Sequence, residues 1–299
     1  MWKIERNIDM KILVLGASGM LGNAVYRLLS EKSGLEVRGT VRSTAAMRNF
    51  RSELAGNLIC GVDVEQSDAL IGLLERERPT VVINCVGLVK QLADAENPLN
   101  AVPINTLLPH RLAKICALLG ARLVHVSTDC VFSGAKGGYT EDDLPDAVDL
   151  YGRSKQLGEV AYPNSVTLRT SIIGHELQSS HGLINWFLQQ ETRCKGYTNA
   201  IFSGLPTVVL ARVIRDYVLC NPSLQGIYHV AAMPISKFAL LTTVAEIYQK
   251  KITIEPDNAL VIDRSLDGSR FRQATGFVAG AWTGLIKEMY EFERKTANV

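Results

Sequence analysis

The sequence predicts an α/β protein in which a doubly wound parallel sheet carries a smaller C-terminal lobe. Two observations support this prediction: short apolar segments alternate with amphipathic helical ones, and the first apolar segment runs into three spaced glycines. Such alternation is typical of parallel strands joined by crossover helices. With 299 residues, of which 47% are hydrophobic, the chain can bury a large core.

The first element pair is KILVLGASGMLG (residues 11–22), where an apolar strand meets an amphipathic helix through Gly16, Gly19 and Gly22. Glycine suits these places because the turn is tight, a pyrophosphate approaches the backbone, and the helix packs closely on the strand. The helix N-terminus also offers unpaired N–H groups to phosphates. The pattern predicts a Rossmann-type dinucleotide-binding turn. The cofactor contacts expected here are Gly16, Ser18, Gly19, Met20 and Leu21.

The remaining elements follow from apolar runs and from the 3.6-residue period of amphipathic helices. Strands are expected at 11–16, 35–41, 58–63, 81–86, 122–127, 165–172 and 227–231. Helices are expected at 19–32, 66–78, 101–119, 151–160 and 208–219. We expect Pro109 to kink the third helix, because proline lacks a backbone N–H.

The alternation ends after Gly174, which predicts a domain boundary. HELQSSHG is typical of a loop, LINWFLQQ of a short amphipathic helix, and GYTNAIFSGLPT is polar and turn-rich. We therefore predict a dinucleotide-binding domain at 10–174, to which 206–232 returns. The substrate-binding lobe is predicted to comprise 175–205 and 233–299.

Composition argues against several other classes of protein. A net charge of +2 without a basic stripe argues against nucleic-acid binding, and no apolar run approaches the roughly 20 residues that span a bilayer. Residues 1–9 lack the apolar region of a signal peptide and precede Met10, so we interpret them as a dispensable extension of a cytoplasmic protein. The six cysteines and five histidines lack metal-ligand spacing, which predicts reduced thiols and no metal.

The end of the second strand indicates which cofactor binds. An NAD site usually presents an acidic residue there, whereas LEVRGTVRS ends near Arg42, whose guanidinium suits a 2′-phosphate. This favours NADPH and leaves NADH as an alternative, since a solvated arginine at a strand end also explains Arg42. Asp63 is placed to accept a hydrogen bond from the adenine, or to cap a turn. The other contacts expected at strand ends are Val64, Cys85, Val86 and Gly87.

Two later segments, HVSTDCVFSG and YGRSKQLGE, carry candidate acid–base groups. Tyr151 and Lys155 are four residues apart, so both lie on one face of a helix. The lysine ammonium is expected to stabilise the tyrosine phenolate and to lower its pKa from about 10. Such a pair alone is more often a surface tyrosine beside a lysine. The glycine-rich turn and a fifth strand ending in Ser127 and Thr128 favour the catalytic interpretation.

With these motifs the chain resembles an extended short-chain dehydrogenase/reductase, most closely the dTDP-4-dehydrorhamnose reductases. The resemblance covers nearly all of residues 10–290. It depends on GASGMLG, PINTLLPHRLA with Asn105, STDCVFSG, YGRSKQLGE and LRTSIIG. The resemblance implies that Asn105 helps to bind the cofactor.

The resemblance also implies a reaction: NADPH reduces the C4 keto group of a nucleotide-linked 4-keto-6-deoxyhexose for surface polysaccharide. Thr128 would orient the carbonyl, Tyr151 would donate the proton, and Lys155 would bind the nicotinamide ribose. The expected substrate contacts are Lys90, Thr128, Asp129, Ser171 and Trp186. Lys90 also fits a solvated loop, and Trp186 also fits a core position.

The chain departs from this pattern at three places, each of which touches the sugar or nucleotide pocket. Cys130 replaces the usual tyrosine, and SIIG and SSHGLINWF differ from the usual runs. We therefore expect a dTDP- or UDP-linked sugar other than dTDP-rhamnose, such as a UDP-linked N-acetylated one. Two alternatives stay open. One is an epimerase or dehydratase of the same superfamily, against which Arg42 argues, as does Cys130 at the place where a dehydratase completes its Asp-Glu pair; the other is a non-catalytic NADP-binding regulatory subunit. A homodimer is compatible with the resemblance.

Overall fold

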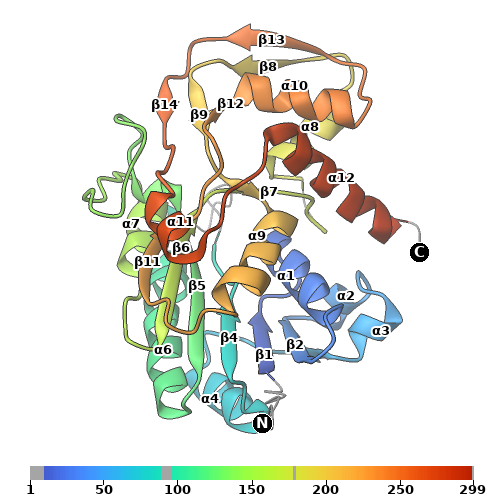
Figure 1. Cartoon of the computed structure of the whole chain (residues 1–299). Helices are drawn as coiled ribbons and strands as arrows, with labels where there is room; N and C mark the ends of the chain where they lie inside the picture. Colours follow the sequence, from blue (N-terminus) through green and yellow to red (C-terminus); the bar gives the residue numbers. More distant parts are fainter. Residues whose placement is uncertain (1–9, 89–95, 178–179, 298–299) are drawn as a thin grey trace, which may run out of the picture.

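The computed structural model describes residues 10–88, 96–177 and 180–297, and within them a seven-stranded sheet forms the centre of the molecule (Figure 1). Its order is β11-β6-β5-β4-β1-β2-β3, and every pair is parallel. The strands are β1 (Met10–Leu15), β2 (Leu35–Val41), β3 (Leu58–Cys60), β4 (Val81–Asn84), β5 (Arg122–Thr128), β6 (Ser165–Thr170) and β11 (Gly226–His229). The predicted Rossmann-type α/β fold is confirmed.

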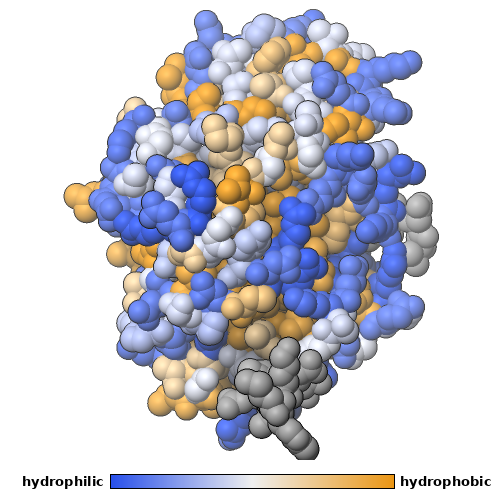
Figure 2. All heavy atoms as spheres, viewed as in Figure 1, coloured by the Kyte–Doolittle hydropathy of each residue, from blue (hydrophilic) through white to orange (hydrophobic). Residues whose placement is uncertain are grey.

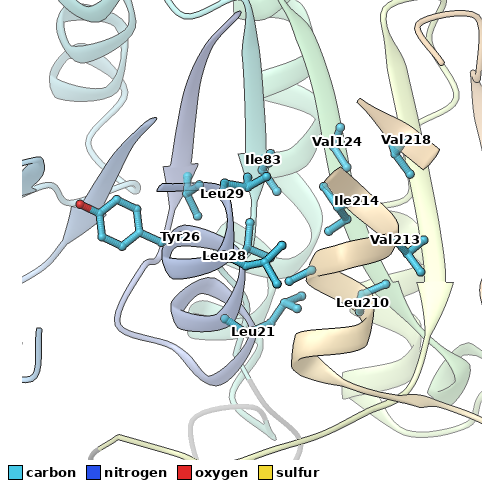
Figure 3. Close-up of a cluster of buried hydrophobic side chains, with 14 of the residues drawn as sticks. Leu21, Tyr26, Leu28, Leu29, Ile83, Val124, Leu210, Val213, Ile214 and Val218 are labelled. Atoms are coloured by element: carbon cyan, nitrogen blue, oxygen red, sulfur yellow. The ribbon is translucent and has the colours of Figure 1, made fainter. Parts of the chain in front are cut away.

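Helices cover both faces of this sheet. One face carries α1 (Met20–Ser30), α9 (Thr207–Val213) and the π-helical segment η4 (Ile214–Val218), and the other carries α4 (Ser67–Glu77) and α6 (Leu108–Leu118). Figure 3 shows apolar side chains of α1, such as Leu28, facing Leu210 and Ile214 over the strands. The short helices α2 (Thr44–Met47) and α3 (Ser52–Ala55) pack on the α1 face, and α7 (Leu150–Leu157) contacts β5.

The long helix predicted at 101–119 is three elements: α5 (Pro98–Ala101), the π-helical segment η2 (Val102–Leu107) and α6. The change from α to π geometry therefore lies just before Pro109, the residue at which we expected a kink. Pro109 has no N–H for the carbonyl of Asn105, and π-turns relieve such gaps in the helical ladder. A Cβ added at Gly158 would lie 1.9 Å from that same carbonyl oxygen, so α7 approaches it closely.

Strand and helix ends also differ from the prediction. The third strand stops at Cys60 rather than 63, and the predicted strand 165–172 divides into β6 and β7 (Ile172–Ile173). The helix predicted at 208–219 changes to π geometry at Ile214. These ends depend on pairing between strands and on helix packing, which apolar periodicity does not specify.

The lobe contains more strand than the sequence indicated. GYTNAIFSGLPT, predicted as polar and turn-rich, contributes to three strands, and its Ala200, Phe202 and Leu205 are buried. The strands after β7 and outside the main sheet are β8 (Arg193–Tyr197), β9 (Ala200–Phe202), β10 (Leu205–Pro206), β12 (Ile235–Ser236), β13 (Thr253–Asp257) and β14 (Ile262–Asp263). The helices are α8 (Leu183–Gln189), α10 (Lys237–Ile247), α11 (Ser269–Thr275) and α12 (Trp282–Ala297).

The lobe lies beyond the carboxyl ends of the central strands (Figure 1). The pairing of β11 with β6 and the contact of α9 with α1 support our proposal that 206–232 belongs to the sheet domain. On the face seen in Figure 2, hydrophobic residues run down the middle between hydrophilic sides. No helix within the described ranges is long and apolar enough to cross a membrane.

Substitution of Gly22 tests the contact between α1 and the glycine turn. A Cβ at Gly22 would lie 2.0 Å from the carbonyl oxygen of Gly16, whereas one at Gly72 of α4 meets nothing within 4 Å. We expect Gly22→Ala to lower the free energy of unfolding by at least about 1–3 kcal/mol. Gly72→Ala should raise it by up to about 1 kcal/mol through helix propensity. Urea unfolding of both variants measures this, and equal stabilities would contradict it.

Candidate functional site

The glycine turn connects β1 to α1 at the edge of the sheet that faces the lobe. Gly16 has φ +80°, a left-handed value that favours glycine, and its N–H donates to Thr40 Oγ1 at 3.1 Å. Gly19 is the N-cap of α1 and supplies no side-chain cap. Because Gly19 has no side chain, the N-cap residue does not cover the first N–H groups of this 11-residue helix. This arrangement fits the pyrophosphate of a dinucleotide.

The residues predicted to bind the adenine end lie on neighbouring strand ends. Arg42 follows β2 directly and is exposed. Asp63 follows β3, is exposed, and accepts a hydrogen bond from the N–H of Glu65 at 3.0 Å. Through this hydrogen bond Asp63 caps a turn, which is the alternative role that the sequence offered for it. Val64 next to it is half-buried and packs against the apolar core under the sheet.

The segment after β4 is fastened at both ends by asparagine side chains. Asn84 Oδ1 accepts from the N–H of Val86 at 3.1 Å, and Asn105 Oδ1 accepts from the N–H of Leu88 at 3.0 Å. Asn105 Nδ2 donates to Ser154 Oγ of α7 at 3.2 Å. Asn105 is thus buried and joins the segment to α7. The π-turn that holds this side chain is a feature often found at functional sites.

Gly87 brings that segment close to the acid–base pair. A Cβ at Gly87 would lie 3.8 Å from Lys155 Nζ and 3.5 Å from Asn105 Oδ1. Cys85, partly buried at the start of the segment, also faces Lys155, and burial raises the pKa of its thiol to about 12. The predicted cofactor residues of β4 and α7 therefore meet in space.

Lys155 of α7 is 6% exposed, and its Nζ donates to the carbonyl oxygen of Val126 in β5 at 2.9 Å. Burial lowers the pKa of Lys155 to about 8, while the Glu159 carboxylate acts in the opposite direction. Near neutral pH this lysine is therefore a buried ammonium ion at the end of β5.

Tyr151 lies one turn before Lys155 and shares a side-chain hydrogen bond with Thr128. Burial raises the pKa of Tyr151, and the nearby Cys130 and Asp129 raise it further. The expectation that Lys155 lowers this pKa is therefore wrong: desolvation and the neighbouring Cys130 and Asp129 raise it, and Lys155 turns toward Val126. Tyr151 is a neutral phenol at physiological pH, which suits a proton donor.

The predicted substrate residues are only partly brought together. Asp129 lies beside Thr128, whose Oγ1 donates to Asp129 Oδ1 at 3.2 Å, and Ser171 is within hydrogen-bonding reach of the same carboxylate. Burial raises the pKa of Asp129. Trp186 is 38% exposed on α8, so the core position considered for it is excluded. Lys90 lies outside the described residues.

Arg264 is a site residue that sequence reasoning missed. It follows β14 in the lobe, donates from Nε to the carbonyl oxygen of Phe132 at 2.8 Å, and places Nη1 3.9 Å from Cys130 Sγ. Its charge lowers the pKa of Asp129 against the effect of burial. No motif surrounds Arg264, and only the folding of the lobe over β5 brings it here.

None of the six cysteines, all of which lie in the described ranges, forms a disulfide. Across residues 10–88, 96–177 and 180–297, no group of three or more His, Cys, Asp or Glu side chains is placed to hold a metal ion.

Comparison with other proteins gives two kinds of relative. Methionine adenosyltransferase 2 subunit beta of Rattus norvegicus is 25% identical over 251 residues, covering 80% of this chain and 72% of that protein. The probable low-salt glycan biosynthesis reductase Agl14 of Haloferax volcanii is 34% identical over 169 residues, covering 55% of this chain and 54% of that protein.

The fold is also that of a solved reductase. The dTDP-4-dehydrorhamnose reductase of Bacillus anthracis, solved in complex with NADP, has a TM-score of 0.78 and 20% identity, covering 95% of this chain and 100% of that one. A sequence profile described as the RmlD substrate binding domain matches residues 10–291. The chain therefore belongs to the RmlD substrate binding domain family, in the dTDP-4-dehydrorhamnose reductase-like branch of the extended short-chain dehydrogenase/reductase superfamily.

Proposed function

We propose that the protein uses NADPH to reduce the C4 keto group of a nucleotide-linked 4-keto-6-deoxyhexose. One observation carries the proposal: the Tyr151 phenol shares a hydrogen bond with Thr128, and Lys155 lies one turn further along the same helix. A protonated donor beside a second hydroxyl suits a carbonyl oxygen that gains negative charge. The reductase name of the Haloferax relative supports the same class of reaction and a role in glycan synthesis.

The chain's own residues would hold the cofactor along the edge of the sheet. The N-terminus of α1 would bind the pyrophosphate, Arg42 the 2′-phosphate, and Cys85 to Gly87 would lie along the ribose and nicotinamide. Asn105 would act by fixing that segment to α7, because its side chain already bonds Leu88 and Ser154. When bound, NADPH supplies the hydride.

Tyr151 would give its phenolic proton to the carbonyl oxygen as that oxygen becomes a hydroxyl. Thr128 would hydrogen-bond the same oxygen and keep it in line with Tyr151. Lys155 would donate to the ribose hydroxyls and, as a cation, stabilise the phenolate that Tyr151 becomes after proton transfer. Its pKa of about 8 leaves it mostly protonated at pH 7.

The sugar would lie between these residues and the lobe. Asp129, Ser171 and Arg264 offer both acceptors and a cation beside Thr128. Cys130 leaves more room at this end of the site than a tyrosine would. A dTDP- or UDP-linked sugar with a substituent at this end, such as an N-acetyl group, therefore remains our proposal for the substrate.

A non-catalytic regulatory subunit is the second candidate, because the rat relative is named as a subunit of methionine adenosyltransferase. We would follow NADPH absorbance with purified protein and a panel of dTDP- and UDP-linked 4-keto-6-deoxy sugars. Stoichiometric oxidation with one of these sugars would support the reductase. Tight NADPH binding without oxidation on any of them would support the regulatory subunit.

Removal of the Tyr151 hydroxyl should stop proton transfer without removing the cofactor site. We expect Tyr151→Phe to lower kcat about 10²–10⁴-fold while NADPH still binds, since positioned proton donors contribute that much. Tyr217→Phe is the matched control, because Tyr217 packs against Phe277 in the core. Steady-state rates and NADPH fluorescence titrations measure both effects. Full activity in Tyr151→Phe would exclude this residue as the acid.

Arg42 should decide the preference for NADPH over NADH. A hydrogen bond to a charged group contributes about 1.5–3 kcal/mol, so Arg42→Ala should weaken NADPH binding at least about tenfold and leave NADH binding nearly unchanged. Arg111→Ala, which removes an exposed arginine from α6, is the control. Fluorescence titration with both cofactors gives the ratio. An unchanged ratio would show that Arg42 is a solvated strand-end residue.

Cofactor affinity should fall as the pH rises through about 8. The pKa of Lys155 is lowered to about 8, so the ammonium is present below that pH and lost above it. A neutral amine donates more weakly to ribose hydroxyls. NADPH dissociation constants between pH 6.5 and 9.5 measure the effect, with Lys155→Met as the variant that should lack this dependence. A flat profile for the natural protein would contradict it.

A further inference from the structure

A buried ion pair lies directly behind the acid–base residues. Glu159 follows α7, and Arg169 is in β6; both side chains are 4% exposed. Arg169 donates from Nε to Glu159 Oε1 and from Nη2 to Oε2, each at 2.7 Å. This two-bond geometry is typical of a charge-assisted pair between an arginine and a carboxylate.

The same carboxylate is joined to the strand that carries Thr128. Ser127 Oγ donates to Glu159 Oε1 at 2.7 Å, and Ser127 precedes Thr128 at the end of β5. Strand pairing sets Ser127 opposite Arg169 and Thr128 opposite Thr170. Glu159 therefore holds together the ends of α7, β5 and β6 at the point where the candidate site begins.

Three titratable groups act on the Lys155 ammonium from the elements around it: Glu159 after α7, Cys85 after β4, and His125 in β5. Burial raises the pKa of Cys85 to about 12, so its thiol is neutral near pH 8. Burial lowers the pKa of His125 well below its ordinary value, so its ring is neutral too. Of these three groups, Glu159 alone carries charge in the range where Lys155 titrates.

On the far side, Arg169 is held by a neutral partner. Its Nη1 lies 3.2 Å from His229 Nε2, and His229 Nδ1 lies 3.0 Å from the carbonyl oxygen of Tyr139. Burial and the charge of Arg169 lower the pKa of His229 to about 4. His229 therefore orients the guanidinium without competing for Glu159.

We propose that Glu159, anchored by Arg169 and Ser127, is a positioning residue that keeps Lys155 protonated and fixes the end of β5. It touches neither the cofactor nor the substrate in this role; it acts through Lys155 and Ser127. The consequence for turnover rests on the proposed reductase function. The effect on Lys155 itself does not, and can be measured without any substrate.

The direct test follows the Lys155 titration by NMR. The protein would be labelled with [¹³C]lysine, the Lys155 ¹³Cε signal identified by its loss in Lys155→Arg, and its midpoint measured between pH 6 and 11. We expect Glu159→Gln to lower the midpoint by about one unit, because it removes an opposite charge near the ammonium. An unchanged midpoint in folded Glu159→Gln would overturn the proposal.

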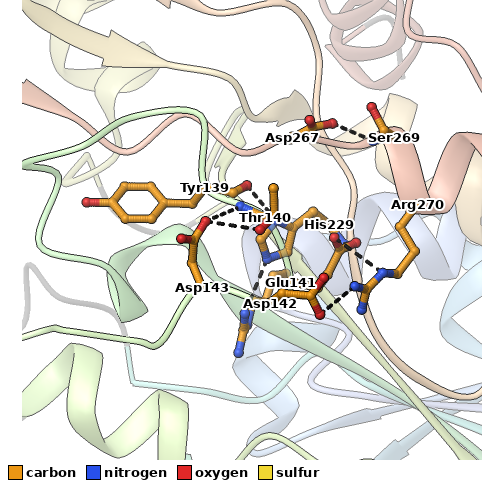
Figure 4. Close-up of polar contacts among 10 residues, drawn as sticks. Tyr139, Thr140, Glu141, Asp142, Asp143, His229, Asp267, Ser269 and Arg270 are labelled. Atoms are coloured by element: carbon orange, nitrogen blue, oxygen red, sulfur yellow. Dashed lines mark hydrogen bonds and ion pairs between the residues drawn. The ribbon is translucent and has the colours of Figure 1, made fainter.

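Glu141→Gln is the matched control. Glu141 is equally buried, with 4% of its side chain exposed, and Figure 4 shows it facing Arg270. It accepts from the N–H of His229 at 2.8 Å, so it belongs to neighbouring polar contacts without reaching Lys155. Its replacement should leave the Lys155 midpoint in place, and a shift equal to that of Glu159→Gln would overturn the proposal.

Two further variants keep the test decisive if Glu159→Gln does not fold with Arg169 left unpaired. Glu159→Asp retains the charge, so the midpoint of the Lys155 titration should stay close to that of the natural protein. The double variant Glu159→Met with Arg169→Met replaces the ion pair by apolar groups, a change that buried pairs commonly tolerate. It should lower the Lys155 midpoint, and a natural midpoint in this folded variant would overturn the proposal.

The same variants connect the inference to turnover. With an active sugar, the alkaline limb of kcat/KM should move to lower pH in Glu159→Gln by the same amount as the NMR midpoint. A purely structural role would lower the rate at every pH without moving that limb, and this result would overturn the catalytic part. If the natural protein oxidises no NADPH, the reductase proposal fails, and the NMR midpoint still decides the role of Glu159.

Discussion

The parallel register of the central strands is the constraint on which the rest of the structure depends. Leu15 pairs with Asn84 and Asn84 with His125, so β1, β4 and β5 end at one edge of the sheet. Every group proposed to act there is carried by a strand end, by the helix after it, or by the lobe above. A crossover helix always returns the chain to the same edge, which is why open α/β sheets bind ligands there.

The fold was largely predictable from sequence because its determinants are local. Apolar runs and glycine spacing identify strands and turns within a few residues, and parallel order follows from their alternation with helices. The two π-helical segments and the short strands of the lobe were not predictable. Pro103 and Pro109 disturb the helical ladder, yet where it relaxes depends on α7 packing against Asn105. The lobe strands pair residues distant in sequence, such as β8 with β13.

Some residues of the candidate site were likewise predictable from the sequence and others were not. Tyr151 and Lys155 are visible because helical spacing places them together, and Thr128 because it ends a strand. Arg264 comes from the lobe, some 130 residues later in the chain than Cys130, which it contacts at 3.9 Å, and no motif links them. The direction of the Tyr151 pKa was also missed. Spacing shows that a lysine is near, but burial and hydrogen bonds decide where its ammonium points.

The choice between an enzyme and a regulatory subunit depends on residues that cofactor binding alone does not require. A protein that only binds NADP needs the glycine turn, Arg42 and the segment after β4. Reduction of a carbonyl also needs a proton donor, and the half-buried Tyr151 phenol, hydrogen-bonded to Thr128, suits that role. Burying the ion pair of Glu159 with Arg169 costs desolvation free energy, and replacing such pairs by apolar residues is often neutral or stabilising. Both features lie around Tyr151, so we favour the reductase.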